Sequence, residues 1–121
     1  MNEWKNPNFL KALKNSLNGI KNVYAGEKNI RIQTVFAILV IIAGIFLKIS
    51  LIEWALVFTA IFIVFISEFF NTAIEKVVDM IDENYNEKAK IAKDIAAAAV
   101  SISAIFSVII GVCIFLPKII F

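Results

Sequence analysis

The sequence contains no histidine, one cysteine, two prolines and four glycines. Without histidine, no imidazole can act as a catalytic base or a metal ligand, and a single cysteine can form neither an intrachain disulfide nor a Cys/His zinc site. The glycines are scattered at positions 19, 26, 44 and 111, so no glycine-rich loop of the Walker A type can cradle a nucleotide's phosphates. We expect the single Cys113, which lies in an apolar run, to be a packing residue.

Charged residues are also rare in three long stretches of the chain. The 121 residues are 60% hydrophobic, whereas soluble domains are about 45–50% apolar. The excess is concentrated at about residues 32–52, 54–81 and 95–116, and about 20 apolar residues suffice to cross a bilayer. We predict three transmembrane helices, the second with a cytoplasmic extension. A soluble three-helix bundle would need a polar face on each helix, and the third run offers only Ser101, Ser103 and Ser107.

Residues 8–25, ahead of the first run, predict an amphipathic helix. Its apolar side chains recur at spacings of three and four, and lysines occupy the other faces: Phe9, Leu13, Leu17, Ile20 and Tyr24 form the apolar stripe. Such a helix can lie in the membrane interface or pack against the rest of the protein, and the two placements are compatible.

The positive charges predict the orientation. The side opposite the N-terminus carries only Lys48 and Lys118, whereas the N-terminal segment and the 76–94 loop are rich in lysine. Because positive residues stay in the cytoplasm, we expect the N-terminus and this loop inside and the C-terminus outside.

Polar residues line one face of the second run. At about 100° per residue, a helix places five of them on a single stripe: Glu68, Asn71, Glu75, Asp79 and Asp82. Glu68 lies among phenylalanines, where a carboxylate costs on the order of 2–3 kcal/mol or more. We therefore interpret it as a functional group, in preference to a carboxylate that only bonds a neighbouring helix.

Two further acidic residues, Glu27 and Asp94, are expected near the cytoplasmic surface of the membrane, as is Glu75. Glu27 precedes the first run, and two carboxylates at one depth can hold Mg²⁺ together with waters and phosphate oxygens. From spacing alone, an ion pair of Glu27 with Lys28 or Arg31 is the favoured interpretation. Asp94 immediately precedes the third run, where we expect it to cap the helix.

These features fit two functions. A buried carboxylate facing lipid, a cation site and a basic loop are parts that phosphoryl transfer needs. A small proton- or cation-coupled transporter subunit, in which Glu68 titrates, is the alternative. A kinase would consume ATP only with a lipid alcohol and Mg²⁺, whereas a transporter would give pH-driven flux without a phospholipid product.

Two segments resemble motifs of the bacterial diacylglycerol kinase/undecaprenol kinase family. One runs from Glu68 to Asp79 and the other from Ala92 to Ala97, and the similarity extends from about Phe9 to Lys118. The resemblance implies one all-α integral-membrane domain, residues 1–121, that forms a homotrimer in the bacterial inner or plasma membrane. It also implies transfer of phosphate from ATP, with Mg²⁺, to the hydroxyl of a membrane lipid alcohol, and we expect no nucleic-acid partner.

The resemblance also implies the roles of individual residues. Glu68 would be the general base, Asn71 would help to orient the site, and Glu27 and Glu75 would bind the metal on the ATP phosphates. The remaining nucleotide contacts would come from Lys93, Asp94 and the loop residues Asn84, Tyr85 and Asn86.

Two segments resemble the Gram-positive branch of the family: Asn71–Thr72–Ala73 and the ending Phe115–Lys118. Members of that branch are often undecaprenol kinases, so this resemblance favours undecaprenol over diacylglycerol as the acceptor. Four positions depart from residues frequent in the family: Asn84, Asn86, Glu87 and Ala98. These departures affect the expected contacts with the nucleotide.

Overall fold

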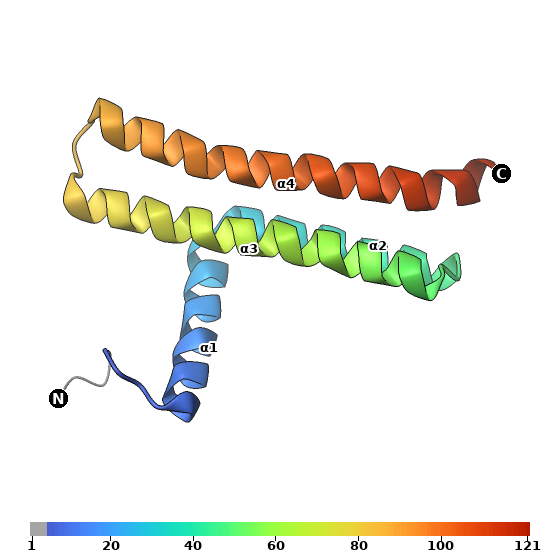
Figure 1. The fold of residues 1–121 in the computed structure, drawn as a ribbon, viewed down its shortest axis with the longest axis horizontal. Coiled ribbons are helices and arrows are strands. Elements are labelled where there is room, and N and C mark those ends of the chain that lie inside the picture. Colours follow the sequence, from blue (N-terminus) through green and yellow to red (C-terminus); the bar gives the residue numbers. More distant parts are fainter. Residues whose placement is uncertain (1–4) are drawn as a thin grey trace.

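The computed structural model describes residues 5–121, most of which are helical. The elements are α1 (Phe9–Gly26), α2 (Lys28–Phe46), α3 (Leu51–Ile81) and α4 (Glu87–Ile120). In Figure 1, α3 and α4 lie side by side and antiparallel, α2 runs along α3, and α1 leaves this bundle almost at a right angle. Within the described residues, α2, α3 and α4 are long and apolar enough to cross a membrane. The predicted all-α membrane fold is confirmed.

Side-chain caps determine where α1 and α3 begin. The Asn8 side chain accepts a hydrogen bond from the Lys11 backbone N–H at 2.9 Å. At the start of α3, the Ser50 hydroxyl accepts from the Glu53 N–H, and the Glu53 carboxylate accepts from the Ser50 N–H. This capping box satisfies two backbone donors that the first turn leaves unpaired.

The last helix is longer than the predicted span of residues 95–116. It begins at Glu87, where the Asn86 side chain is the N-cap, and it continues past Pro117 to Ile120. The prediction that Asp94 caps this helix is therefore wrong, since Asp94 lies two turns inside it. The first two turns of α4, residues 87–94, are polar and precede the apolar run. Hydropathy alone does not predict that such a polar segment belongs to the helix.

The turn between α2 and α3 interrupts an apolar stretch that we predicted as helix up to residue 52. Helix α2 ends at Phe46, and Lys48 takes a left-handed conformation with φ of 51°. The Ile49 N–H then bonds back to the Gly44 carbonyl at 3.2 Å, and the Lys48 N–H to Ile45 at 3.3 Å. This is the Schellman pattern that ends many helices, here without the usual glycine.

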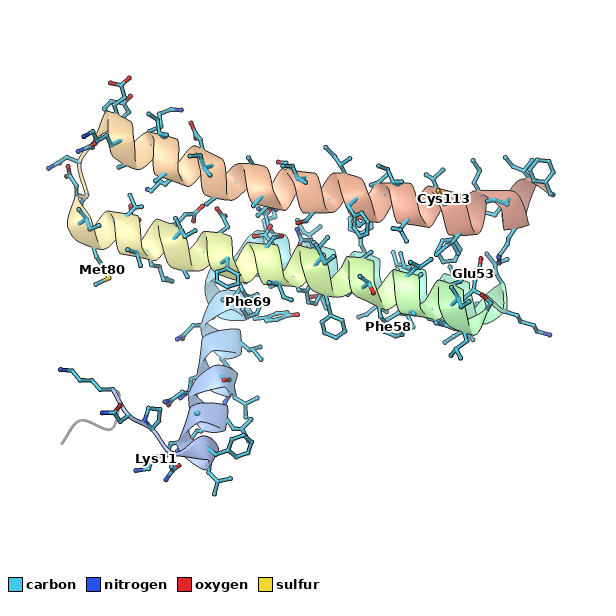
Figure 2. All side chains as sticks on the ribbon, in the orientation of Figure 1. Lys11, Glu53, Phe58, Phe69, Met80 and Cys113 are labelled. Atoms are coloured by element: carbon cyan, nitrogen blue, oxygen red, sulfur yellow. The ribbon has the colours of Figure 1, made fainter. Side chains whose placement is uncertain are left out.

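The buried core of a single chain is small. Ile49, Val57 and Ile114 form its centre, and Trp54 packs partly buried against them. Many large apolar side chains instead point outward from α2, α3 and α4, as the sticks in Figure 2 show. This pattern is typical of helices whose outer faces contact lipid or other membrane helices.

Helix α1 keeps its apolar stripe exposed. Its main contacts are with α2, and Phe9 and Leu17 are 76% and 59% exposed. Within one chain, α1 packs on α2 only near its C-terminal end, where Val23 is buried, and most of its apolar stripe stays exposed. Its direction across the bundle in Figure 1 suits a helix lying in the membrane interface.

The junction between α1 and α2 is held by side-chain hydrogen bonds. The Tyr24 and Thr34 hydroxyls are 2.7 Å apart. The Arg31 guanidinium donates to the carbonyls of Tyr24, at 2.6 Å, and Ala25, at 3.3 Å. Arg31 thereby satisfies carbonyls at the C-terminal end of α1, where a positive charge is also favoured by the helix dipole.

Candidate active site

Glu68 lies buried on α3, with 3% of its surface exposed. The Gln33 side chain of α2 donates from Nε2 to Glu68 Oε1 at 3.0 Å. Gln33 lies in the second turn of α2, so this bond lies roughly 8 Å along the span from the α1–α2 junction. The neutral amide of Gln33 thus orients the Glu68 carboxylate within the membrane-spanning part of the chain.

Two other carboxylates act electrostatically on Glu68. They belong to Glu27, at the α1–α2 junction, and Glu75, two turns farther along α3. Glu75 also accepts a hydrogen bond from Asn71 Nδ2 at 3.2 Å. Glu27 and Glu75 therefore lie close enough to influence Glu68, although the three side chains do not form a metal-binding cluster in the described chain.

The expected ion pair of Glu27 with Lys28 or Arg31 is not found among residues 5–121. Arg31 instead donates to backbone carbonyls of α1. The Glu27 carboxylate therefore makes no direct ion pair with either neighbour in the described structure.

The carboxylates of Glu27 and Glu75 are the oxygen ligands that Mg²⁺ prefers. No group of three or more Asp, Glu, Cys or His side chains in the described part of the chain could hold a metal by itself. Two carboxylates nevertheless fit the way Mg²⁺ is bound at phosphate sites, where waters and phosphate oxygens supply most of the ligands.

Lys93 and Asp94 point to different partners. Lys93 reaches from α4 to Asp79 of α3, with Nζ 2.7 Å from Oδ1, and it also acts electrostatically on Glu75. Asp94 instead pairs with Lys90 on α4 at 2.6 Å. Lys93 therefore joins the acidic stripe of α3, whereas Asp94 lies on an exposed side of α4.

The α3–α4 loop is held through Asp82. Asp82 accepts from the Asn84 N–H at 2.9 Å and from the Asn86 side chain at 3.3 Å. The Tyr85 side chain extends outward, and the residue is 81% exposed. All three loop residues predicted to lie over the nucleotide are exposed and therefore accessible to a ligand.

Our sequence reasoning did not single out Gln33. Its only signal is an amide early in an otherwise apolar run. Three buried polar atoms in the cluster have no hydrogen-bond partner within the described chain: Gln33 Oε1, Asn71 Oδ1 and Thr72 Oγ1. Because buried polar atoms are normally paired, such a cluster is typical of a ligand site.

An apolar cavity of about 660 Å³ lies between α2, α3 and α4. Gln33, Phe36 and Phe65 are among the residues that line it, and its α4 wall extends from Ala104 to Ile119. Gln33 therefore both lines the cavity and bonds the buried carboxylate. This combination suits a molecule with a polar head and an apolar chain.

The family described as prokaryotic diacylglycerol kinase matches residues 14–115. The chain belongs to this family. It is 41% identical over 110 residues to the undecaprenol kinase of Bacillus subtilis strain 168, covering 91% of this chain and 89% of that relative. It is 40% identical over 118 residues to a Synechocystis diacylglycerol kinase, covering 96% and 67%, and 35% identical over 101 residues to the Escherichia coli K12 diacylglycerol kinase, covering 84% and 83%.

This member of the prokaryotic diacylglycerol kinase family is thus a membrane lipid kinase, a phosphotransferase with ATP as co-substrate. The predicted lipid kinase is confirmed in preference to the transporter subunit.

Proposed function

We propose that this kinase phosphorylates undecaprenol at the cytoplasmic face of the membrane, with Glu68 as general base. The observation that carries the proposal is a carboxylate buried in a transmembrane helix, bonded to Gln33 beside an apolar cavity. A carboxylate at that depth is costly, and it meets a lipid alcohol without removing the lipid from the bilayer.

In the proposed step, Glu68 accepts the proton of the lipid hydroxyl while the hydroxyl oxygen forms a bond to the γ-phosphorus of ATP. The bond between that phosphorus and the β–γ bridging oxygen breaks, and ADP leaves with the electron pair. Positioning and charge stabilisation supply most of the catalysis in phosphoryl transfer. Asn71, one turn from Glu68 and bonded to Glu75, helps to orient the acidic groups.

Glu27 and Glu75 would hold the Mg²⁺ that accompanies ATP. When bound, this ion neutralises charge on the phosphate oxygens. Glu75 lies roughly 10 Å along α3 from Glu68 toward the cytoplasmic end. The spacing suits a nucleotide held at the interface and an acceptor hydroxyl held deeper.

Basic and loop residues at the end of α3 and the start of α4 would bind the nucleotide. Lys93 provides a positive charge that interacts electrostatically with Glu75, and its present partner, Asp79, lies on the same helix as Glu75. The other proposed contacts, carried from the sequence resemblance, are Asp94, Asn84, Tyr85 and Asn86.

The acceptor is proposed from the relatives and the sequence. The Bacillus subtilis relative is named an undecaprenol kinase, and the motif residues here resemble the Gram-positive branch. Diacylglycerol is the second candidate, because the Synechocystis and Escherichia coli relatives are named diacylglycerol kinases.

We further propose a homotrimer in the bacterial inner or plasma membrane, with the N-terminus cytoplasmic and the C-terminus outside. The lysine distribution supports this orientation. The small core of one chain and its outward apolar faces are consistent with contacts between copies.

The direct test offers the purified protein labelled ATP and Mg²⁺ in micelles, with undecaprenol and diacylglycerol in separate reactions. We expect a higher kcat/KM for undecaprenol. A higher value for diacylglycerol would reverse the choice of acceptor, and no product with either lipid would overturn the proposal.

The base assignment is tested with Glu68→Gln. We expect phosphorylation to be lost while ATP binding is largely kept, because the amide preserves the shape of the side chain but cannot take the proton. Glu53→Gln, which neutralises a carboxylate at the other end of α3, should retain activity. Equal loss of ATP binding and turnover in Glu68→Gln would contradict the assignment.

A further inference from the structure

Gln33 contacts the proposed base and also lines the apolar cavity. Its Nε2 is 3.0 Å from Glu68 Oε1, and its side chain lines the cavity. Ser107 also lines the cavity, but its hydroxyl bonds to the Ala104 carbonyl of its own helix. Gln33 is thus a polar lining group that contacts Glu68 directly.

The charge around Glu68 explains why an amide suits this position. Among the described residues, the carboxylates of Glu27 and Glu75 act electrostatically on Glu68. A lysine or arginine in place of Gln33 would neutralise the base and weaken its attraction for a proton. An amide donates one hydrogen bond without adding charge, so it orients the carboxylate and leaves it basic.

The amide also distinguishes the two carboxylate oxygens. Glu68 Oε1 accepts from Gln33, and Oε2 has no such donor from α2 in the described structure. The Gln33 Oε1 atom is buried, and no group of the described chain bonds to it. An unpaired buried acceptor beside a lined cavity points to a ligand with a polar head at this position.

From this geometry we propose that Gln33 is a positioning residue of the kinase: it holds Glu68 Oε1 so that Oε2 faces the hydroxyl of the lipid alcohol. This inference rests on the proposed function, because it takes Glu68 as the base. It adds a residue from α2 to a site otherwise built from α3, α4 and the α1–α2 junction.

The test compares Gln33→Met and Gln33→Glu with the wild-type protein. Methionine keeps the length and approximate volume of glutamine but cannot donate or accept this hydrogen bond. Glutamate keeps the shape and places a second carboxyl group against Glu68. Ser67→Ala is the matched control, because Ser67 is adjacent to Glu68 and its hydroxyl bonds only the Val64 carbonyl of its own helix, at 2.8 Å.

We expect Gln33→Met to lower kcat for the lipid about tenfold or more, since hydrogen bonds to charged groups are among the stronger ones. The KM for ATP should change less than twofold, because the nucleotide contacts lie nearer the cytoplasm. Gln33→Glu should move the acid limb of the pH–rate profile to higher pH, because two carboxyl groups in contact share one proton. Ser67→Ala should match the wild type in all three quantities.

The inference is overturned if both Gln33 variants keep kcat within twofold and share the wild-type pH profile, since that result shows a space-filling role. Glu68→Gln, measured alongside, separates the two proposals. If it abolishes transfer while Gln33→Met does not, the base assignment stands and the positioning role fails. If Glu68→Gln stays active, the base assignment itself fails. Thermal unfolding of each variant in micelles identifies any loss of activity that comes from misfolding.

Discussion

Glu75 interacts with a neutral, an acidic and a basic residue of the candidate site. It accepts from Asn71 at 3.2 Å, and it acts electrostatically on both Glu68 and Lys93. Its position two turns from Glu68 separates the group proposed to hold the metal from the group proposed to take the proton. A single helix can therefore carry both tasks at different depths.

We predict that Glu75→Gln raises the Mg²⁺ concentration needed for half-maximal activity at least tenfold, or abolishes activity. The physical reason is that a neutral amide is a weaker ligand than a carboxylate for a hard cation. Titrating Mg²⁺ at saturating ATP and lipid measures this requirement.

The control is Glu83→Gln, which removes an exposed carboxylate of the α3–α4 loop and should leave the Mg²⁺ requirement unchanged. Normal Mg²⁺ dependence in Glu75→Gln would remove this residue from the metal site.

At the level of single residues, the helical spacing and the family resemblance predict the acidic residues of α3 as site residues, but they do not predict Gln33. Glu68 and Glu75 are visible in the sequence because carboxylates on one helical face of an apolar run are rare. Gln33 becomes significant only once α2 packs on α3 and brings residues 33 and 68 into contact. The same limit applies on α4. Lys93 and Asp94 are adjacent in the sequence and are predicted together, but the structure pairs Lys93 with Asp79 of α3 and Asp94 with Lys90 of its own helix.

At the level of helices, the apolar runs predict the spans but not their ends. A run reports which residues tolerate lipid, whereas an end depends on caps and turn conformation. The stretch around Lys48 is apolar on both sides of the turn, so hydropathy continues through it while the helix stops at Phe46. At α4 the opposite occurs, because the helix begins in a polar segment capped by Asn86.

The turn between α2 and α3 depends on a close approach at Gly44. A Cβ added there would lie 2.8 Å from Trp54 Cη2 and 3.0 Å from Ile49 Cδ1. We predict that Gly44→Ala lowers the free energy of unfolding by about 1–3 kcal/mol, because the indole must move in a well-packed turn. Unfolding of the purified protein in micelles measures the change.

Gly111→Ala is the matched control for this prediction. It lies on α4 in the membrane-spanning region, and an added Cβ there meets nothing within 4 Å. Alanine is also the better helix former, so this variant should be neutral or slightly more stable. A Gly44→Ala protein as stable as the Gly111→Ala protein would show that the Trp54 ring adapts freely.

At the level of the whole molecule, the number of spans is predicted from the sequence, but the direction of α1 is not. The right-angled departure of α1 depends on the Tyr24–Thr34 contact and on the Arg31 bonds to α1 carbonyls. These join residues on either side of a junction whose geometry no periodicity describes. At the other end of the bundle, Lys118 of α4 lies 2.7 Å from Glu53 of α3, which is labelled in Figure 2.

The orientation of the whole chain can be tested with introduced cysteines. In a Cys113→Ser background, a membrane-impermeant thiol reagent added to intact cells or spheroplasts should label Phe121→Cys and not Asn84→Cys. The reason is that the lysine-rich segments are expected inside. Labelling of Asn84→Cys in intact cells would invert the topology. Disrupted cells, in which both positions should react, provide the control.

The depth of Glu68 has a kinetic consequence on the proposed mechanism. The acceptor alcohol reaches this carboxylate by lateral diffusion in the leaflet, so turnover should follow the mole fraction of lipid in the bilayer or micelle. Adding inert detergent at constant total acceptor should slow the enzyme by surface dilution. The nucleotide arrives from water, so the rate should depend on its ordinary bulk concentration.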